Sequence, residues 1–84
     1  MKQPEPITPG QRRRAIDKHL ARRLYEARTT ANISTVEAAK SIASDQVQIH
    51  RIEKKEARIP ACVLLILAEL YDKPLSWFFE GMED

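Results

Sequence analysis

The chain has 84 residues, enough for one small domain with a single hydrophobic core but too few for a multidomain enzyme. Charged residues make up 31% of it, and β-branched and aromatic residues are too few and too scattered for a β-sandwich, so we expect an all-α fold. The net charge is +2, but residues 1–58 contain 13 Lys and Arg against 7 Asp and Glu, whereas residues 59–84 contain 1 against 5. A basic segment of this kind favours a polyanionic partner, most often nucleic acid.

The composition also argues against several classes of protein. The single cysteine, Cys62, excludes an internal disulfide and a cysteine-based zinc site. The sequence after Met1 has no apolar signal-peptide core, and the longest apolar run, residues 61–68, is too short to cross a bilayer, so we expect a cytoplasmic protein without membrane contact. Because no nucleophile-base pair, glycine-rich phosphate loop or metal-ligand spacing is present, we predict no catalysis, no cofactor and no metal site.

The first two predicted segments are an arm and a long helix. Three prolines remove backbone donors and disfavour helix in the residues before them: Pro4, Pro6 and Pro9. We therefore predict a flexible arm over residues 1–11. Apolar residues then recur at helical spacing: Ile16, Leu20, Leu24 and Ala27. This pattern predicts a helix over residues 12–29, and Asn32 is suited to the turn that follows.

Capping signals predict the next two helices. Ser34 and Glu37 fit a capping box, in which each side chain binds the backbone N–H of the other residue, and they predict a helix over residues 35–42. The same signature beginning at Asp45 predicts a helix over residues 46–54. Only a short break separates the two helices.

Two more helices complete the predicted domain. Pro60 is suited to the first turn of a helix over residues 60–71, the most apolar element, in which we expect Cys62 and Tyr71 to lie in the core. The sequence after it predicts a short helix over residues 75–79. Such a short helix persists only if its aromatic side chains dock on the rest of the protein.

Two short helices joined by a tight turn, the second basic on its outer face, are typical of a helix-turn-helix. In this chain the first helix would bury Ala38, Ala39 and Ile42 against Ile49 and Ile52 of the second. The small side chain of Ala39 would let the two backbones approach closely. The residues left facing outward would be Gln46, Val47, His50, Arg51 and Lys54.

Over residues 20–81 the chain resembles the lambda-repressor-like family of Cro/cI or XRE-type regulators. The matching positions are Ile33 and Ser34, Ala39, Ile49, the run Arg51-Ile52-Glu53, and the closing segment from Leu75 to Gly81. The resemblance implies a compact five-helix DNA-binding and dimerisation domain over residues 12–84, with an ion pair between Arg28 and Glu53. The chain departs from the family at Ala43, Ser44, Lys55, Asp72 and Lys73. In the family, glycine is common at the positions of Ala43 and Lys55, and a glycine followed by an aliphatic residue is common at the positions of Asp72 and Lys73. The geometry of these turns is therefore left open.

The resemblance places the helix over residues 46–54 in the major groove of duplex DNA. The amide of Gln46 suits adenine, the guanidinium of Arg51 suits guanine, and Val47 suits a thymine methyl group. Gln48 either contacts a base or is used by the capping box with Asp45. His50 either contacts DNA or is a surface histidine without a role.

Backbone phosphates would be bound by basic side chains and by the start of the second helix. The candidates are Arg12, Arg13, Arg14, Ser34, Thr35, Lys54, Lys55 and Arg58. The alternative for any one of these cations is a solvated surface charge. The arginine triplet has a second alternative, which is insertion into a minor groove.

The aromatic end of the chain suggests a dimer. Trp77, Phe78 and Phe79 cannot all turn inward from a short helix, so we expect at least one of them on the surface, where with Leu75 they would form a dimer interface. Core packing is the alternative for any single one of them. A two-fold dimer would place its recognition helices about 34 Å apart on a palindromic operator.

We therefore predict a sequence-specific transcriptional regulator that binds double-stranded DNA as a homodimer. Repression is favoured because a chain without a second domain has nothing with which to sense a ligand, while activation through RNA polymerase or another protein partner is the alternative. A hypothesis of a different class is an antitoxin-like protein-interaction module whose DNA binding is secondary. A third is a protein that coats DNA irrespective of sequence.

Overall fold

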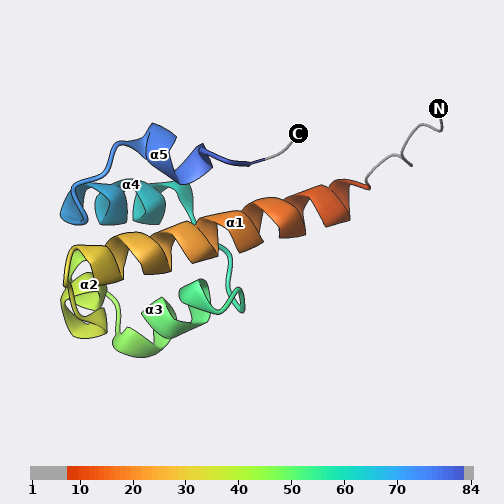
Figure 1. Ribbon diagram of the computed structural model, residues 1–84. Coiled ribbons are helices and arrows are strands. Elements are labelled where there is room, and N and C mark those ends of the chain that lie inside the picture. Colours follow the sequence, from red (N-terminus) through yellow and green to blue (C-terminus); the bar gives the residue numbers. More distant parts are fainter. Residues whose placement is uncertain (1–7, 83–84) are drawn as a thin grey trace.

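The computed structural model describes residues 8–82, and this range contains five α-helices and no strand. The helices are α1 (Pro9–Thr30), α2 (Thr35–Ser41), α3 (Gln46–Glu53), α4 (Ala61–Leu70) and α5 (Leu75–Phe79). The predicted compact five-helix, all-α fold is confirmed. The long helix α1 packs against α3 and α5, while α2 packs against α3 and α4 (Figure 1).

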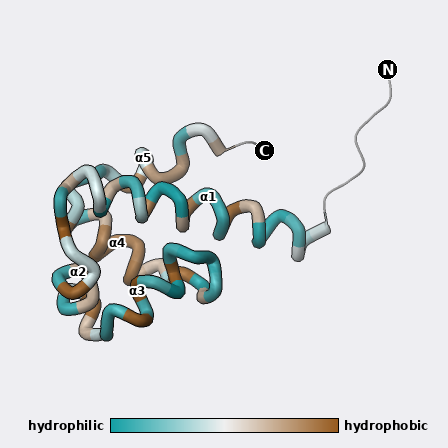
Figure 2. Tube along the Cα trace, turned by 60° about the horizontal axis from the view of Figure 1, so that its bottom comes forward, coloured by the Kyte–Doolittle hydropathy of each residue, from teal (hydrophilic) through white to brown (hydrophobic). Residues whose placement is uncertain are grey.

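One core joins the helices. Its largest fully buried side chains are Leu24, Ile49, Ile52, Leu67 and Phe78. These five residues come from four of the helices, so each of those helices is held through side chains that contact the same cluster. Figure 2 shows the apolar character along α4 and the alternation of polar and apolar residues along α1.

The start of α1 differs from the prediction. The helix begins at Pro9, three residues earlier than expected, because Thr8 caps it: Thr8 Oγ1 accepts from the Gln11 N–H at 3.1 Å, and Gln11 Oε1 accepts from the Thr8 N–H at 2.9 Å. Pro9 occupies the first helical position, where its missing N–H costs nothing. The predicted flexible arm is therefore wrong for residues 9–11, and its residues 1–7 lie outside the described part of the chain.

Left-handed residues follow each of the first four helices. They are Asn32 (φ 60°), Ala43 (φ 54°), Lys55 (φ 65°) and Asp72 (φ 58°). After α2, the Ser44 N–H donates to the Ala39 carbonyl at 2.9 Å, the bond that closes a Schellman motif. Equivalent bonds follow α1, α3 and α4. The backbone therefore keeps the left-handed turn at the end of each of these helices, even where the family usually has glycine and this chain has another residue.

Helix α4 is covered on one face only. Tyr71, the residue that caps its end, is 2% exposed, as expected for the core. Cys62 is exposed, so its predicted place in the core is wrong: it lies on the same open face of α4 as the exposed Leu65 and Glu69. Within residues 8–82, no helix has both the length and the apolar character that crossing a membrane requires.

Candidate nucleic-acid interface

Caps fix the starts of α2 and α3. At α2 the capping box is complete, with Ser34 Oγ accepting from the Glu37 N–H at 3.1 Å and Glu37 Oε1 accepting from the Ser34 N–H at 3.3 Å. At α3 only half of the box forms: Asp45 Oδ1 accepts from the Gln48 N–H at 3.0 Å. The return bond from the Gln48 side chain is absent from the described hydrogen bonds, so the amide of Gln48 is not used by this cap.

The two helices pack as the spacing predicted. Ala38 and Ala39 of α2 are 0% and 3% exposed, and Ile49 and Ile52 of α3 are each 1% exposed in the same cluster. Alanine side chains leave room for a close approach of the two backbones. Because Ile49 and Ile52 are buried while most other residues of α3 are exposed, the helix has one buried stripe and one open face.

The open face of α3 carries the residues proposed to read bases. Val47 is 60% exposed, and Gln46, His50 and Arg51 are also exposed, whereas Gln48 is partly buried. Thr35 Oγ1 donates to Gln46 Oε1 at 3.3 Å, which links the first residue of α2 to the first residue of α3. This contact leaves the two N–H donors of the Gln46 amide free. The sequence indicated both residues singly but held no signal that they touch.

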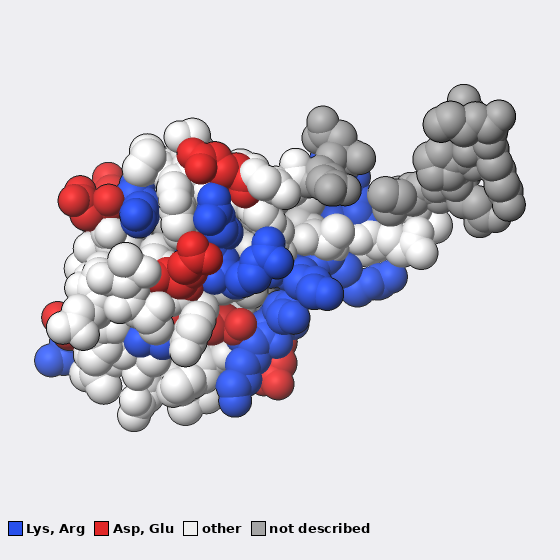
Figure 3. Space-filling model, viewed as in Figure 1, with Lys and Arg blue, Asp and Glu red and all other residues white. Residues whose placement is uncertain are grey.

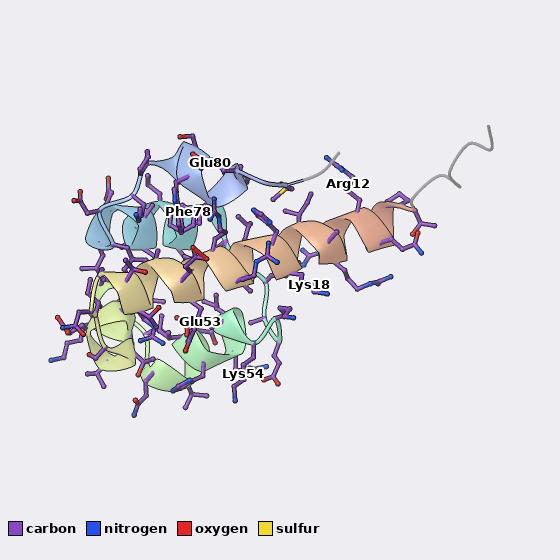
Figure 4. The ribbon with its side chains drawn as sticks, viewed as in Figure 1. Arg12, Lys18, Glu53, Lys54, Phe78 and Glu80 are labelled. Atoms are coloured by element: carbon purple, nitrogen blue, oxygen red, sulfur yellow. The ribbon has the colours of Figure 1, made fainter. Side chains whose placement is uncertain are left out.

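An ion pair ties α3 to α1. Arg28 donates from Nε to Glu53 Oε2 at 2.7 Å, from Nη2 to Glu53 Oε1 at 3.1 Å, and from Nη1 to the carbonyl of Ile33 at 3.0 Å. The side chains of Arg28 and Glu53 are only 12% and 7% exposed. The hydrogen bond to Glu53 raises the pKa of Arg28 above its usual value. Glu53 points from α3 toward α1 (Figure 4), so the pair sets the angle at which α3 is presented.

The proposed phosphate contacts fall into four places. Lys54 and Lys55 are exposed at the end of α3, and Lys54 points away from α1 (Figure 4). Arg58 is exposed in the segment that joins α3 to α4, and Arg12, Arg13 and Arg14 are exposed near the start of α1. Ser34 and Thr35 begin α2, but their hydroxyls are occupied by Glu37 and Gln46. Figure 3 shows the basic side chains gathered along α1 and below it.

The proposed dimer surface is smaller than predicted. Phe78 is 0% exposed and belongs to the core, so its assignment to an interface is wrong: the helix turns this ring inward, edge-on to Trp77 at 5.1 Å between centroids. Trp77 lies between two cations, with Arg23 at 4.0 Å and Lys73 at 4.9 Å from the ring centroid. The sequence held no signal for this stack, because its members come from α1 and from both sides of a turn.

Two apolar residues of α5 remain on the surface. Leu75 is 42% exposed and Phe79 is 45% exposed. They lie four residues apart, and therefore on one face of the helix. This face is the part of the predicted interface that is available to a partner.

Comparison with known proteins points to the class of protein that the sequence predicts, a helix-turn-helix transcriptional regulator. No family model matches the sequence. The chain is 30% identical over 69 residues to an uncharacterised HTH-type transcriptional regulator of Rickettsia conorii, a match that covers 82% of this chain and 55% of that protein. It is equally similar to an uncharacterised HTH-type transcriptional regulator of Rickettsia prowazekii, with 82% and 53% covered. The chain spans about half the length of these curated relatives, and the match agrees with the helix-turn-helix that α2 and α3 form.

Proposed function

We propose that this protein is a transcriptional regulator that binds specific sequences in double-stranded DNA by placing α3 in the major groove. The observation that carries the proposal is the open face of α3, on which Gln46, Val47 and Arg51 are exposed while Arg28 and Glu53 hold the helix from behind. The two Rickettsia relatives, both named as HTH-type transcriptional regulators, support it.

The chemistry of the open face suits base edges. The free N–H donors of Gln46 and the second lone pair of its oxygen suit adenine, the guanidinium of Arg51 suits guanine, and the branched side chain of Val47 suits a thymine methyl group. The exposed His50 and the partly buried Gln48 would add further contacts from the same helix. Lys54 and Lys55 at its end, together with the N–H groups at the start of α2, would bind the phosphates that flank the groove.

We propose a homodimer that forms through the outer face of α5. Pairing of Leu75 and Phe79 with the same residues of a second copy would remove both apolar side chains from water around a two-fold axis. Two recognition helices about 34 Å apart would then read a palindromic operator. A chain of this kind represses by occupying a promoter.

The dimer is tested with Phe79→Glu. This variant should be a monomer that stays folded and binds the operator more weakly, whereas a wild type that is already monomeric would contradict the dimer.

The base contacts are tested by footprinting on genomic fragments with competitor DNA, using proteins whose helical content matches the wild type. We expect protection of a palindrome and a loss of affinity of about 1–3 kcal/mol, or roughly 5- to 150-fold, for Gln46→Ala or Arg51→Ala. Lys40→Ala, on the exposed side of α2, is the control and should bind like the wild type. Weak binding that ignores sequence would overturn the proposal in favour of a DNA-coating protein.

A further inference from the structure

The first half of α1 projects beyond the other helices. At about 1.5 Å per residue the 22 residues of α1 are about 33 Å long. The buried residues of the helix begin at His19, whereas every residue from Thr8 to Ala15 is exposed. We call residues 9–18 the α1 overhang, which extends to one side in Figure 1. The Thr8–Gln11 capping box holds its first turn, and near its other end Ile16 is partly buried against the core.

The α1 overhang is strongly basic. It contains four cations, Arg12, Arg13, Arg14 and Lys18, and a single acid, Asp17. In the described part of the chain, the ion pairs involve Arg23 and Arg28, and none uses a cation of the overhang. Apart from Ala15 and Ile16 the overhang has little apolar surface for a protein partner. Its charges are therefore available to a polyanion.

A hollow lies between the α1 overhang and the segment that joins α3 to α4. It has a volume of about 200 Å³ and is lined by Arg13, Asp17, Arg58 and Ile59. Arg58 lines it from the segment that follows Lys54 and Lys55, so cations run from the end of α3 to the overhang, interrupted by one exposed acid, Glu56. Figure 3 shows this band of basic side chains. Two guanidinium groups beside one carboxylate leave a net positive charge, and guanidinium groups match the geometry of phosphate oxygens.

We propose that the α1 overhang and Arg58 form a second surface for the DNA backbone, which binds phosphates outside the base pairs that α3 reads. The proposal rests on the proposed function for its partner, duplex DNA. Ten residues of helix span about 15 Å, equivalent to about 4 base pairs at 3.4 Å each. Because the cations stand on a formed helix, less ordering would be required on binding than for a flexible arm.

The test compares two double variants that remove the same charge. Arg13→Gln/Arg58→Gln removes both guanidinium groups of the hollow, and the control Arg22→Gln/Lys40→Gln removes two exposed cations elsewhere. Affinity is measured against salt concentration on a random 30-base-pair duplex. Each lost phosphate contact should reduce the slope of log K against log salt by about 0.9, so we expect a slope smaller by about 1.8 for the first variant and an unchanged slope for the control. An unchanged slope in the first variant, or an equal fall in both, would overturn the proposal.

A second arm of the experiment uses the protected palindrome with long or trimmed flanking DNA. Trimming the flanks should weaken binding of the wild type and the control more than binding of Arg13→Gln/Arg58→Gln, which keeps the other three cations of the overhang, and equal losses in all three would contradict the proposal. The two proposals fail in different ways. If no specific site exists but the slope on random duplex falls as expected, the base-reading function fails and the backbone surface stands. If Arg51→Ala abolishes specificity while the slopes do not differ, the reverse holds.

Discussion

Helix α1 holds α3 and α5 by different means. Toward α3 it presents Arg28, which makes two hydrogen bonds to Glu53 in a mostly buried pair. Toward α5 it presents apolar surface to Phe78 and the guanidinium of Arg23 to the ring of Trp77, while the ion pair from Arg23 to the exposed Glu80 is long, at 3.6 Å. Hydrogen bonds are directional and fix an angle, whereas apolar burial supplies free energy without direction. Both helices share the apolar core, but only the proposed reading helix, α3, is also fixed to α1 by short directional bonds from a mostly buried pair.

The largest effect should come from the α5 side. Phe78→Ala removes a fully buried ring, and we expect a loss of about 4 kcal/mol in the free energy of unfolding from lost burial and the cavity that remains. Phe79→Ala, one position along on the exposed face, is the matched control and should cost far less. Urea unfolding of the two variants measures the difference. Similar losses for both would show that Phe78 does not carry the docking of α5.

Substitutions in the Arg28–Glu53 ion pair should affect stability differently from Phe78→Ala, because removing one partner should cost more than removing both. Glu53→Ala leaves the mostly buried Arg28 with the Ile33 carbonyl as its remaining hydrogen-bond partner, and we expect a loss of about 3 kcal/mol in the free energy of unfolding. Removing both charges in Arg28→Leu/Glu53→Leu should restore most of this stability, because apolar groups of similar size replace buried pairs at little cost.

Measuring the affinity of the same double variant for specific DNA distinguishes a role of the ion pair in orienting α3 from a role in stabilising the fold. If the pair serves to orient α3, Arg28→Leu/Glu53→Leu should unfold like the wild type in urea and yet bind the operator more weakly. Stability that stays as low as in Glu53→Ala would contradict this interpretation of the pair.

The sequence predicted what local chemistry decides. The five helices and the capping box at Ser34 follow from periodicity and short-range signals, and the outward face of α3 follows from the spacing of Ile49 and Ile52. The family resemblance supplied the pairing of Arg28 with Glu53. The direction of Phe78 and the stack on Trp77 depend on how α5 docks, which is a long-range property. The start of α1 was missed because the prolines outweighed the Thr8 cap.

A gain of stability is expected in the turn between α2 and α3. Ala43 is exposed and has φ 54°, a conformation that costs a residue with a Cβ about 1–2 kcal/mol. Ala43→Gly removes this strain but adds chain entropy to the unfolded state, so the net gain should be about 1 kcal/mol or less. Ala31→Gly is the control, because Ala31 caps α1 with φ −77° and should gain nothing. Thermal unfolding of both variants decides, and a destabilised Ala43→Gly would show that the turn is not strained.

The smallest effect at neutral pH concerns Tyr71, beside the ion pair. Its Oη is buried without a hydrogen-bond partner among the described residues. Burial, and next the negative charge of Glu53, raise the pKa of Tyr71 well above its usual value, although Arg28 acts in the opposite direction. Tyr71→Phe should therefore change stability by about 1 kcal/mol or less at pH 7, because the lost hydroxyl makes no bond.

At alkaline pH, Tyr71 should contribute to the loss of stability in a way that the exposed Tyr25 does not. An unfolded tyrosine releases its proton near pH 10, before the folded Tyr71 does, so the stability that Tyr71 contributes is complete below about pH 10 and is lost as the pH rises toward its folded pKa. Tyr71→Phe should remove this part of the alkaline loss of stability. Tyr25→Phe, at a tyrosine that is 53% exposed, should retain it. Urea unfolding at pH 8 and pH 11 makes the comparison, and an equal alkaline loss in both variants would show that the loss does not come from Tyr71.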